Sequence, residues 1–165
     1  MRNLKRVLTG LVTSLVAAGA VATAATPANA APVGTCRDLH SFTIEFGTGG
    51  DDLRYNSELA IWLTTSIGSI RLEPVFGQFS NWSFNTRDLT FQNHSITVSS
   101  CAVSGVQIRL IQHPSWPEGA DNWDMISFEL WGYAAGGSVA QHMSPPDGSP
   151  LKRFTESSPT WTRAM

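Results

Sequence analysis

The stretch "SFTIEFGTGGDDLR" (Ser41 to Arg54) predicts the fold class of the chain. Its first six residues alternate between polar and apolar side chains, with Phe42, Ile44 and Phe46 on one face. A period of two is typical of a β-strand that buries one face and exposes the other. The run ends at two adjacent glycines, a composition that predicts a turn.

The same alternation recurs along the chain between clusters of Gly, Pro, Asn, Asp or Ser. The apolar positions of these further runs are Leu59, Ile61 and Leu63, then Ile96 and Val98, then Val106, Ile108 and Leu110, and finally Ile126, Phe128 and Leu130. No helical stripe is evident after residue 30. Seven or eight short strands, each with one apolar face, predict an all-β fold: an antiparallel, jelly-roll-like β-sandwich of about eight strands.

Residues 1–30 read as a signal peptide, not as part of the fold. Three cations precede an apolar run, and the segment ends in the small residues "ANA" (Ala28 to Ala30). A retained N-terminal membrane anchor is the alternative. Cleavage would leave residues 31–165 as a single β-sandwich domain, with a loop-rich C-terminal segment at about 134–165.

The charge and the hydropathy of the remaining chain exclude some partners. Loss of the three signal-peptide cations leaves eight Lys+Arg against thirteen Asp+Glu, a net charge of −5. Nucleic acid and anionic lipid both attract basic surfaces, so we expect no nucleic-acid partner. No second apolar run approaches the roughly 20 residues of a transmembrane helix, and we therefore expect a secreted, extracellular protein.

The two cysteines, Cys36 and Cys101, lie outside the predicted signal peptide. Two lone cysteines in an exported chain most often pair, so we expect a disulfide between them. The bond would close a loop of 65 residues, and the chain-entropy model then gives a stabilisation of about 4 kcal/mol.

Two acidic bends are candidate ligand sites. Asp51 and Asp52 follow the glycine pair, and Asp121 and Asn122 precede another predicted strand. Oxygen-rich bends suit a hard cation such as Ca²⁺, although each bend is also compatible with a plain exposed turn. Strand-end loops of a sandwich gather at its two ends, so the bends can meet. So many carboxylates in one place then need Arg54 or a bound cation as counter-charge.

All six tryptophans lie after residue 30, and some of them are candidates for ligand binding. An exposed indole stacks on the apolar face of a sugar ring or on a protein partner. The candidate ligand-binding residues are Trp62, Trp82, Trp116 and Arg54. We expect Trp123 and Trp161 to pack beneath the C-terminal segment instead.

The chain has no catalytic signature. It lacks Gly-x-Ser-x-Gly, His-Glu-x-x-His and a phosphate loop, and its four histidines are scattered. The leading hypothesis is a non-catalytic binding module for an extracellular carbohydrate, lipid surface or protein, with Ca²⁺ as its candidate cofactor. One alternative is an extracellular hydrolase that uses carboxylates such as Asp51 and Asp124. Another is a protein-interaction or inhibitor domain that uses the loop Pro114–Pro117.

Three motifs together carry a family resemblance: "TGGDDLR", "GADNWDMISFEL" and "PLKRFTESSPTWT" (Pro150 to Thr162). With them the chain resembles a family of small secreted actinobacterial proteins. The motif order is also similar, more loosely, to the PLAT (lipoxygenase-homology) β-sandwich. That second likeness implies ligand roles for the two acidic bends. The chain departs from the first family at Tyr55–Glu58, where its members are glycine-rich, and at Ala120, where they have glycine.

Overall fold

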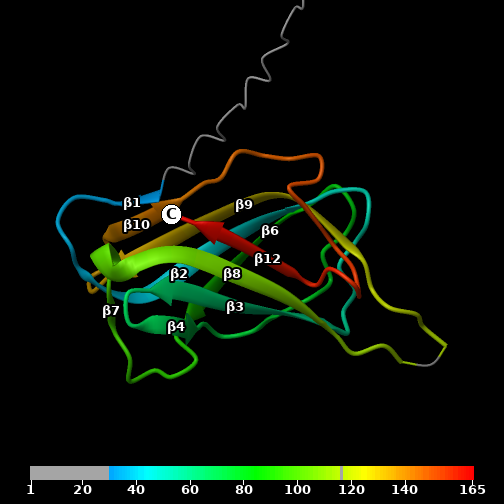
Figure 1. Cartoon of the computed structure of the whole chain (residues 1–165), viewed down its shortest axis with the longest axis horizontal. Helices are drawn as coiled ribbons and strands as arrows, with labels where there is room; N and C mark the ends of the chain where they lie inside the picture. Colours follow the sequence, from blue (N-terminus) through cyan, green and yellow to red (C-terminus); the bar gives the residue numbers. More distant parts are fainter. Residues whose placement is uncertain (1–29, 116) are drawn as a thin grey trace, which may run out of the picture.

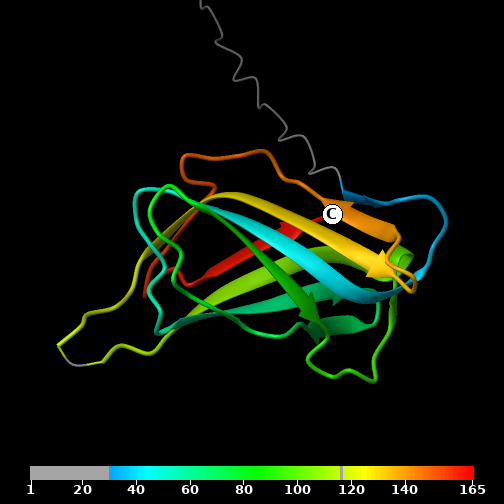
Figure 2. The same cartoon turned by 180° about the vertical axis from the view of Figure 1, so that it is seen from behind.

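The computed structural model describes residues 30–115 and 117–165, so the predicted signal peptide lies, apart from Ala30, outside the described residues. The described chain forms two antiparallel sheets packed face to face, which confirms the predicted β-sandwich (Figure 1, Figure 2). The larger sheet contains β1 (Ala30–Pro32), β2 (Asp38–Thr48), β6 (Phe84–Thr90), β7 (Val98–Ser99), β9 (Trp123–Ala134), β10 (Val139–Met143) and β11 (Lys152–Phe154). The smaller sheet contains β3 (Ser57–Thr65), β4 (Gly68–Arg71), β5 (Val75–Phe76), β8 (Val103–Gln112) and β12 (Thr160–Ala164).

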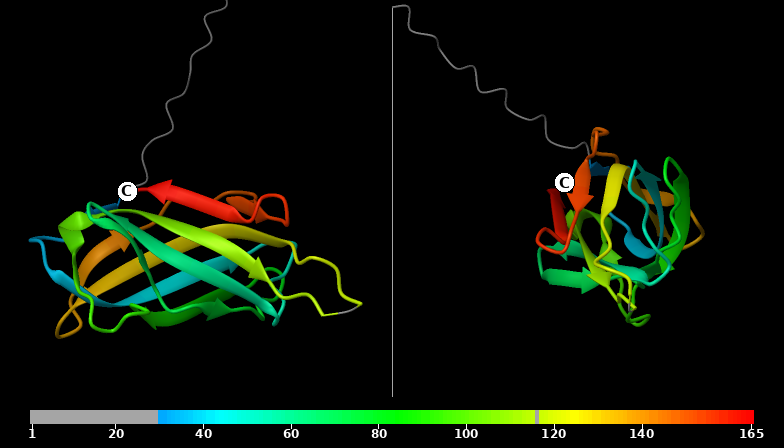
Figure 3. Two further views of the ribbon diagram at one scale, coloured as in Figure 1. Left: turned by 60° about the horizontal axis from the view of Figure 1, so that its bottom comes forward. Right: turned by 90° about the vertical axis from the view of Figure 1, so that its right-hand side faces the viewer.

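The order of strands places β9 and β2 inside the larger sheet and β8 and β3 inside the smaller one. The larger sheet runs β1-β10-β9-β2-β6, with β11 paired to β9 and β7 paired to β2. The smaller sheet runs β12-β8-β3-β4, with β5 paired to β3. Long-range pairing therefore dominates, and the loops gather at the two ends of the sandwich (Figure 3).

The core lies between the sheets, as the alternation in β2 predicts. Phe42, Ile44 and Phe46 point inward and are buried, and they pair across strands with residues of β6 and β9. On β3 and β8 the predicted apolar positions are likewise buried. At about 25 cal/mol per Å² of apolar surface, this burial is the main favourable term of the fold.

One predicted face in β9 is wrong. The alternation placed Ile126 in the core and Met125 outside, but Met125 is fully buried and Ile126 is partly exposed. A register irregularity opposite Gly47 and Thr48 inserts one extra residue in β9. Such a bulge reverses the inward and outward positions on one side of it, and Phe128 and Leu130 beyond it still face inward.

The disulfide Cys36–Cys101 is present, as predicted. Cys36 precedes β2, and Cys101 lies in the 3-10 turn η1 (Ser100–Ala102) that precedes β8. The bond therefore ties the start of a central strand of one sheet to the start of a central strand of the other. None of the helices among the described residues has the length and apolar character needed to cross a membrane.

The C-terminal segment contributes more strand than its composition predicts. Its three strands β10, β11 and β12 extend both sheets. Between β10 and β11 it runs as an irregular loop rich in Pro and Ser. The "KRF" of β11 pairs with the start of β9, so the tail reaches the end of the sandwich that carries the acidic bends.

Candidate functional site

One end of the sandwich gathers three loops: residues 49–56 between β2 and β3, residues 77–83 between β5 and β6, and residues 113–122 between β8 and β9 (on the right in Figure 1). Backbone hydrogen bonds join the first loop to the start of β9. Gly49 N donates to Asp124 O at 2.7 Å, and Asp124 N donates to Asp51 O at 3.2 Å. The two acidic bends therefore lie side by side, as their position in a sandwich allows.

Asp121 is the central residue of this junction. Its side chain is only 4% exposed and accepts hydrogen bonds from the backbone N and the Nε of Arg54, each at 3.0 Å, and from the hydroxyl of Ser57. The side-chain amide of Gln112 also bonds the backbone N–H and C=O of Asp121, at 2.9 and 2.8 Å. Charge-assisted bonds to one carboxylate are the stronger kind, so Asp121 fixes the two bends together.

A second arginine holds the neighbouring carboxylates. Arg153 of β11 donates from Nη2 to Asp51 and from Nη1 to Asp124, both at 2.8 Å. Its guanidinium fork spans two carboxylates from different strand ends. Arg54 completes the arrangement, because its remaining N–H groups face the carbonyl oxygens of Gly119 and Ala120.

The predicted metal ligands therefore differ in their surroundings. Asp51 and Asp121 are each bonded to an arginine, whereas Asp52 is exposed and Asn122 is partly buried. Within residues 30–115 and 117–165, no group of three or more His, Cys, Asp or Glu is placed to hold a metal ion. A calcium ion at these four residues would have to compete with two arginines, so these contacts argue against the predicted Ca²⁺ site.

A hollow of about 490 Å³ opens beside the first bend. Its walls are Asp52, Leu53, Arg54, Tyr55, Gln78, Phe79 and Ser80. The ring of Tyr55 is 61% exposed there. Trp82, which is 74% exposed, follows two residues after Ser80, and its ring lies against Gly50, where an added Cβ would be 3.5 Å from the indole. Trp82 is not part of the wall itself, but two residues of backbone span at most about 7 Å, so its Cα lies close to that of Ser80.

The loop that carries Trp82 is held firmly. The backbone N of Trp82 donates to Gly49 O at 2.9 Å, and the backbone O of the next residue, Ser83, accepts a bond from Thr48 N at 2.8 Å. Gln78 and Trp82 are the non-glycine residues with positive φ, +78° and +56°, among the described residues. Each such residue costs about 1–3 kcal/mol, so the surrounding structure must hold this loop in place.

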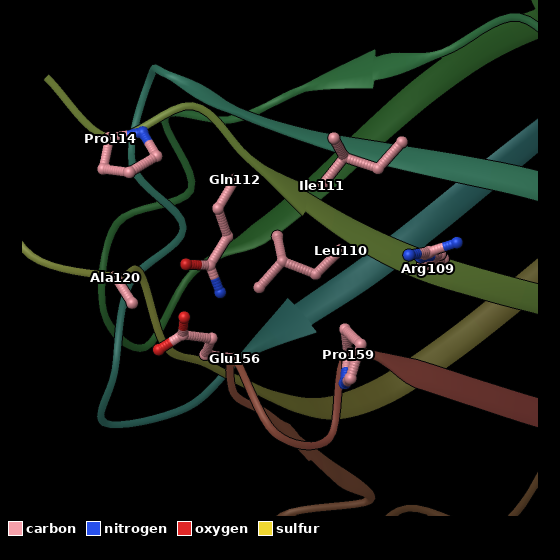
Figure 4. A pocket seen from close by; sticks show the side chains of 8 residues that line it. All are labelled: Arg109, Leu110, Ile111, Gln112, Pro114, Ala120, Glu156 and Pro159. Atoms are coloured by element: carbon pink, nitrogen blue, oxygen red, sulfur yellow. The ribbon is translucent and has the colours of Figure 1, made fainter.

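A second hollow, of about 440 Å³, lies between the end of β8 and the turn before β12 (Figure 4). Its lining is Arg109, Leu110, Ile111, Gln112, Pro114, Ala120, Glu156 and Pro159. Among the residues that the structure describes, none with an aromatic ring lines this wall, and the Gln112 amide is already bonded to Asp121. It therefore offers a ligand fewer specific contacts than the hollow at Tyr55.

Four of the remaining tryptophans, Trp62, Trp123, Trp131 and Trp161, have packing partners, and that of Trp131 is the ring of His142. Arg71 lies 5.5 Å above the ring of Trp62 on the outer face of the smaller sheet. Trp123 is fully buried and stacks on Phe154 of the C-terminal segment, as predicted. Trp161 belongs to that segment itself and packs edge-on against Phe128 of β9. Trp116 lies outside the described residues.

Sequence reasoning missed several residues of this end, above all Tyr55 and Arg153. Tyr55 stands directly after the acidic bend, in the stretch where the chain departs from the resembling family, and that position was an available signal. Arg153 gives no such signal, because it meets Asp51 across 102 residues of chain. The structure places Arg54 in the wall of the hollow, but its guanidinium mainly bonds Asp121 and the neighbouring carbonyls.

The comparisons with known proteins leave the family open. No protein-family model matches the chain, and a search of the curated proteins found no similar sequence. The resemblance to the secreted actinobacterial proteins and to the PLAT sandwich stays a prediction.

Proposed function

We propose that this protein is a secreted, non-catalytic carbohydrate-binding module, and that its binding site is the hollow lined by Tyr55 together with the exposed Trp82 near it. The observation that carries the proposal is a pair of exposed aromatic rings on firmly held loops beside a polar hollow. Among the three ligand classes considered, carbohydrate fits this pattern best. A lipid surface would favour a larger apolar patch, whereas here the rings are interspersed with Asp52, Gln78 and Ser80.

The contacts that a sugar needs are all represented in this hollow. The flat face of a pyranose ring stacks on an indole or a phenol ring through contact area and C–H to π attraction. Its hydroxyl groups need hydrogen-bond donors and acceptors, which the exposed side chains of Gln78 and Ser80 supply. Loops held by backbone bonds lose little conformational entropy on binding, so the contacts translate efficiently into affinity.

The hydrolase alternative receives less support from the geometry. Asp51 and Asp124, its candidate acid and base, both bond the guanidinium of Arg153 and so share one structural cation. We therefore expect turnover of polysaccharides to be absent in wild type and in Asp124→Asn alike, as measured by release of reducing sugars.

The binding test uses the full mature chain and a set of insoluble polysaccharides: chitin, chitosan, cellulose, xylan and peptidoglycan. We expect sedimentation with at least one of them. Trp82→Ala should weaken that binding by about 2 kcal/mol, roughly thirtyfold, the loss typical of truncating an aromatic anchor.

Ile67→Ala is the matched control. Among residues 30–115 and 117–165, Ile67 is the most exposed large apolar residue, at 83%, but it lies in the β3–β4 turn at the other end of the nine-residue strand β3, about 30 Å away. Its truncation should leave binding unchanged. Equal binding by wild type and Trp82→Ala, with both folded, would rule out this site. Failure to bind any polysaccharide would rule out the function.

A further inference from the structure

At the end of the sandwich that carries the three loops, here called the loop end, carboxylates outnumber the cations that bond them. This excess of negative charge points to the kind of sugar that fits. Four aspartates lie there, Asp51, Asp52, Asp121 and Asp124. Two arginines, Arg54 and Arg153, bond three of them. Two arginines for four aspartates leave one aspartate without an ion pair, and Glu118 in the same loop end adds a further carboxylate, which accepts a bond from Asn56.

Among these four aspartates, Asp52 is the one that forms no ion pair with either arginine. Its side chain is exposed and has no hydrogen-bond or ion-pair partner within the described ranges 30–115 and 117–165. It also lines the hollow, together with Tyr55 and Gln78. The one other charged residue in that wall, Arg54, is turned to Asp121 and to carbonyl oxygens, and so contributes little net positive field.

On this basis, and resting on the proposed function, we propose that the site prefers polysaccharides with free amino groups, that is, glucosamine units over N-acetylglucosamine units. A protonated sugar amine would lie over Asp52 while its ring stacks on Tyr55 or Trp82. The amine and the carboxylate form a charge-assisted pair at the rim of the hollow. An acetylated amine is neutral and cannot form that pair.

The size of the preference for glucosamine follows from the solvent exposure of Asp52. An ion pair open to solvent changes affinity only modestly, by about two- to fivefold. It also depends on salt, because the Debye length falls from about 30 Å at 0.01 M to about 3 Å at 1 M ionic strength. Stacking on the aromatic rings is common to both sugars and carries most of the affinity in each case.

Isothermal titration with the tetrasaccharides of glucosamine and of N-acetylglucosamine tests the preference, at a pH at which the sugar amine is protonated. Wild type should bind the glucosamine form about two- to fivefold more tightly at low salt, and about equally at high salt. Asp52→Asn should lose that preference without losing affinity for the acetylated form. Asp38→Asn removes the same charge from an exposed carboxylate at the start of β2, at the other end of the sandwich, and should keep the preference.

The outcomes separate the two proposals. Equal binding of both tetrasaccharides by wild type, or a preference that survives in Asp52→Asn, overturns the role of Asp52. The role of Asp52 is also overturned if wild type binds neither tetrasaccharide. In that case the proposed function still stands if wild type sediments with another polysaccharide and Trp82→Ala does not. Melting of Asp52→Asn at the wild-type temperature, expected for an exposed residue, shows that the variant is folded.

Discussion

The junction at Asp121 makes the sharpest prediction about how this end of the sandwich is held together. Asp121→Ala removes a carboxylate that is almost completely buried and accepts three hydrogen bonds. Removing one partner of a buried ion pair costs about 3–5 kcal/mol. The Arg54 side chain is 32% exposed and keeps a bond to Ala120 O, so water and that carbonyl compensate part of the loss. We therefore expect a loss of about 3 kcal/mol in the free energy of unfolding, at the low end of that range.

For a domain of this size, 1 kcal/mol shifts the melting temperature by roughly 3 °C, so Asp121→Ala should melt about 9 °C below wild type. Asp121→Asn keeps the shape and one acceptor oxygen and should lose about half as much. The control is Asp88→Ala, because Asp88 is exposed and bonds only Thr43, and its loss should change the stability by less than about 0.5 kcal/mol.

Differential scanning calorimetry of these variants, together with Arg54→Ala and the double variant Arg54→Ala/Asp121→Ala, gives the coupling between the two residues. We expect a coupling energy above about 1 kcal/mol, because the residues are in direct contact. A melting temperature of Asp121→Ala within about 3 °C of wild type, or a coupling near zero, would refute the assignment of Asp121 as the residue that fixes the loops.

Three further predictions concern the disulfide, one glycine and calcium. The Cys36→Ser/Cys101→Ser variant should lose about 4 kcal/mol in urea unfolding, because the bond closes a loop of 65 residues, and an unchanged midpoint would contradict this. Gly77→Ala should lose about 3 kcal/mol, because its Cβ would lie 1.8 Å from Arg54 O, whereas Gly119→Ala meets no atom within 4 Å and should melt like wild type. Millimolar Ca²⁺ should leave the melting temperature unchanged against chelator, because Asp121, Asp51 and Asp124 already form ion pairs with Arg54 and Arg153. A bound ion at 100 times its dissociation constant would instead add about 2.7 kcal/mol.

The sequence by itself determined the fold class, most of the inward faces and the pairing of the cysteines. Each of these features can be predicted from neighbouring residues or from a choice with a single solution. Alternation at period two is visible within six residues, as in Phe42, Ile44 and Phe46, and two cysteines allow a single intramolecular pair. The one wrong face, at Met125 and Ile126, arose where a bulge changes the period, and a bulge depends on the partner strand opposite it.

The tertiary structure alone decided which residues form the loop end and which charges stay unmatched. Both acidic bends were visible as motifs, but their meeting depends on β2 and β9 being neighbours in one sheet. Arg153 reaches Asp51 across 102 residues because β11 pairs with the start of β9, and no local pattern encodes that pairing. The exposure of Tyr55 and Trp82 and the unmatched charge of Asp52 are likewise products of packing, since a side chain's partners are set by its neighbours in space.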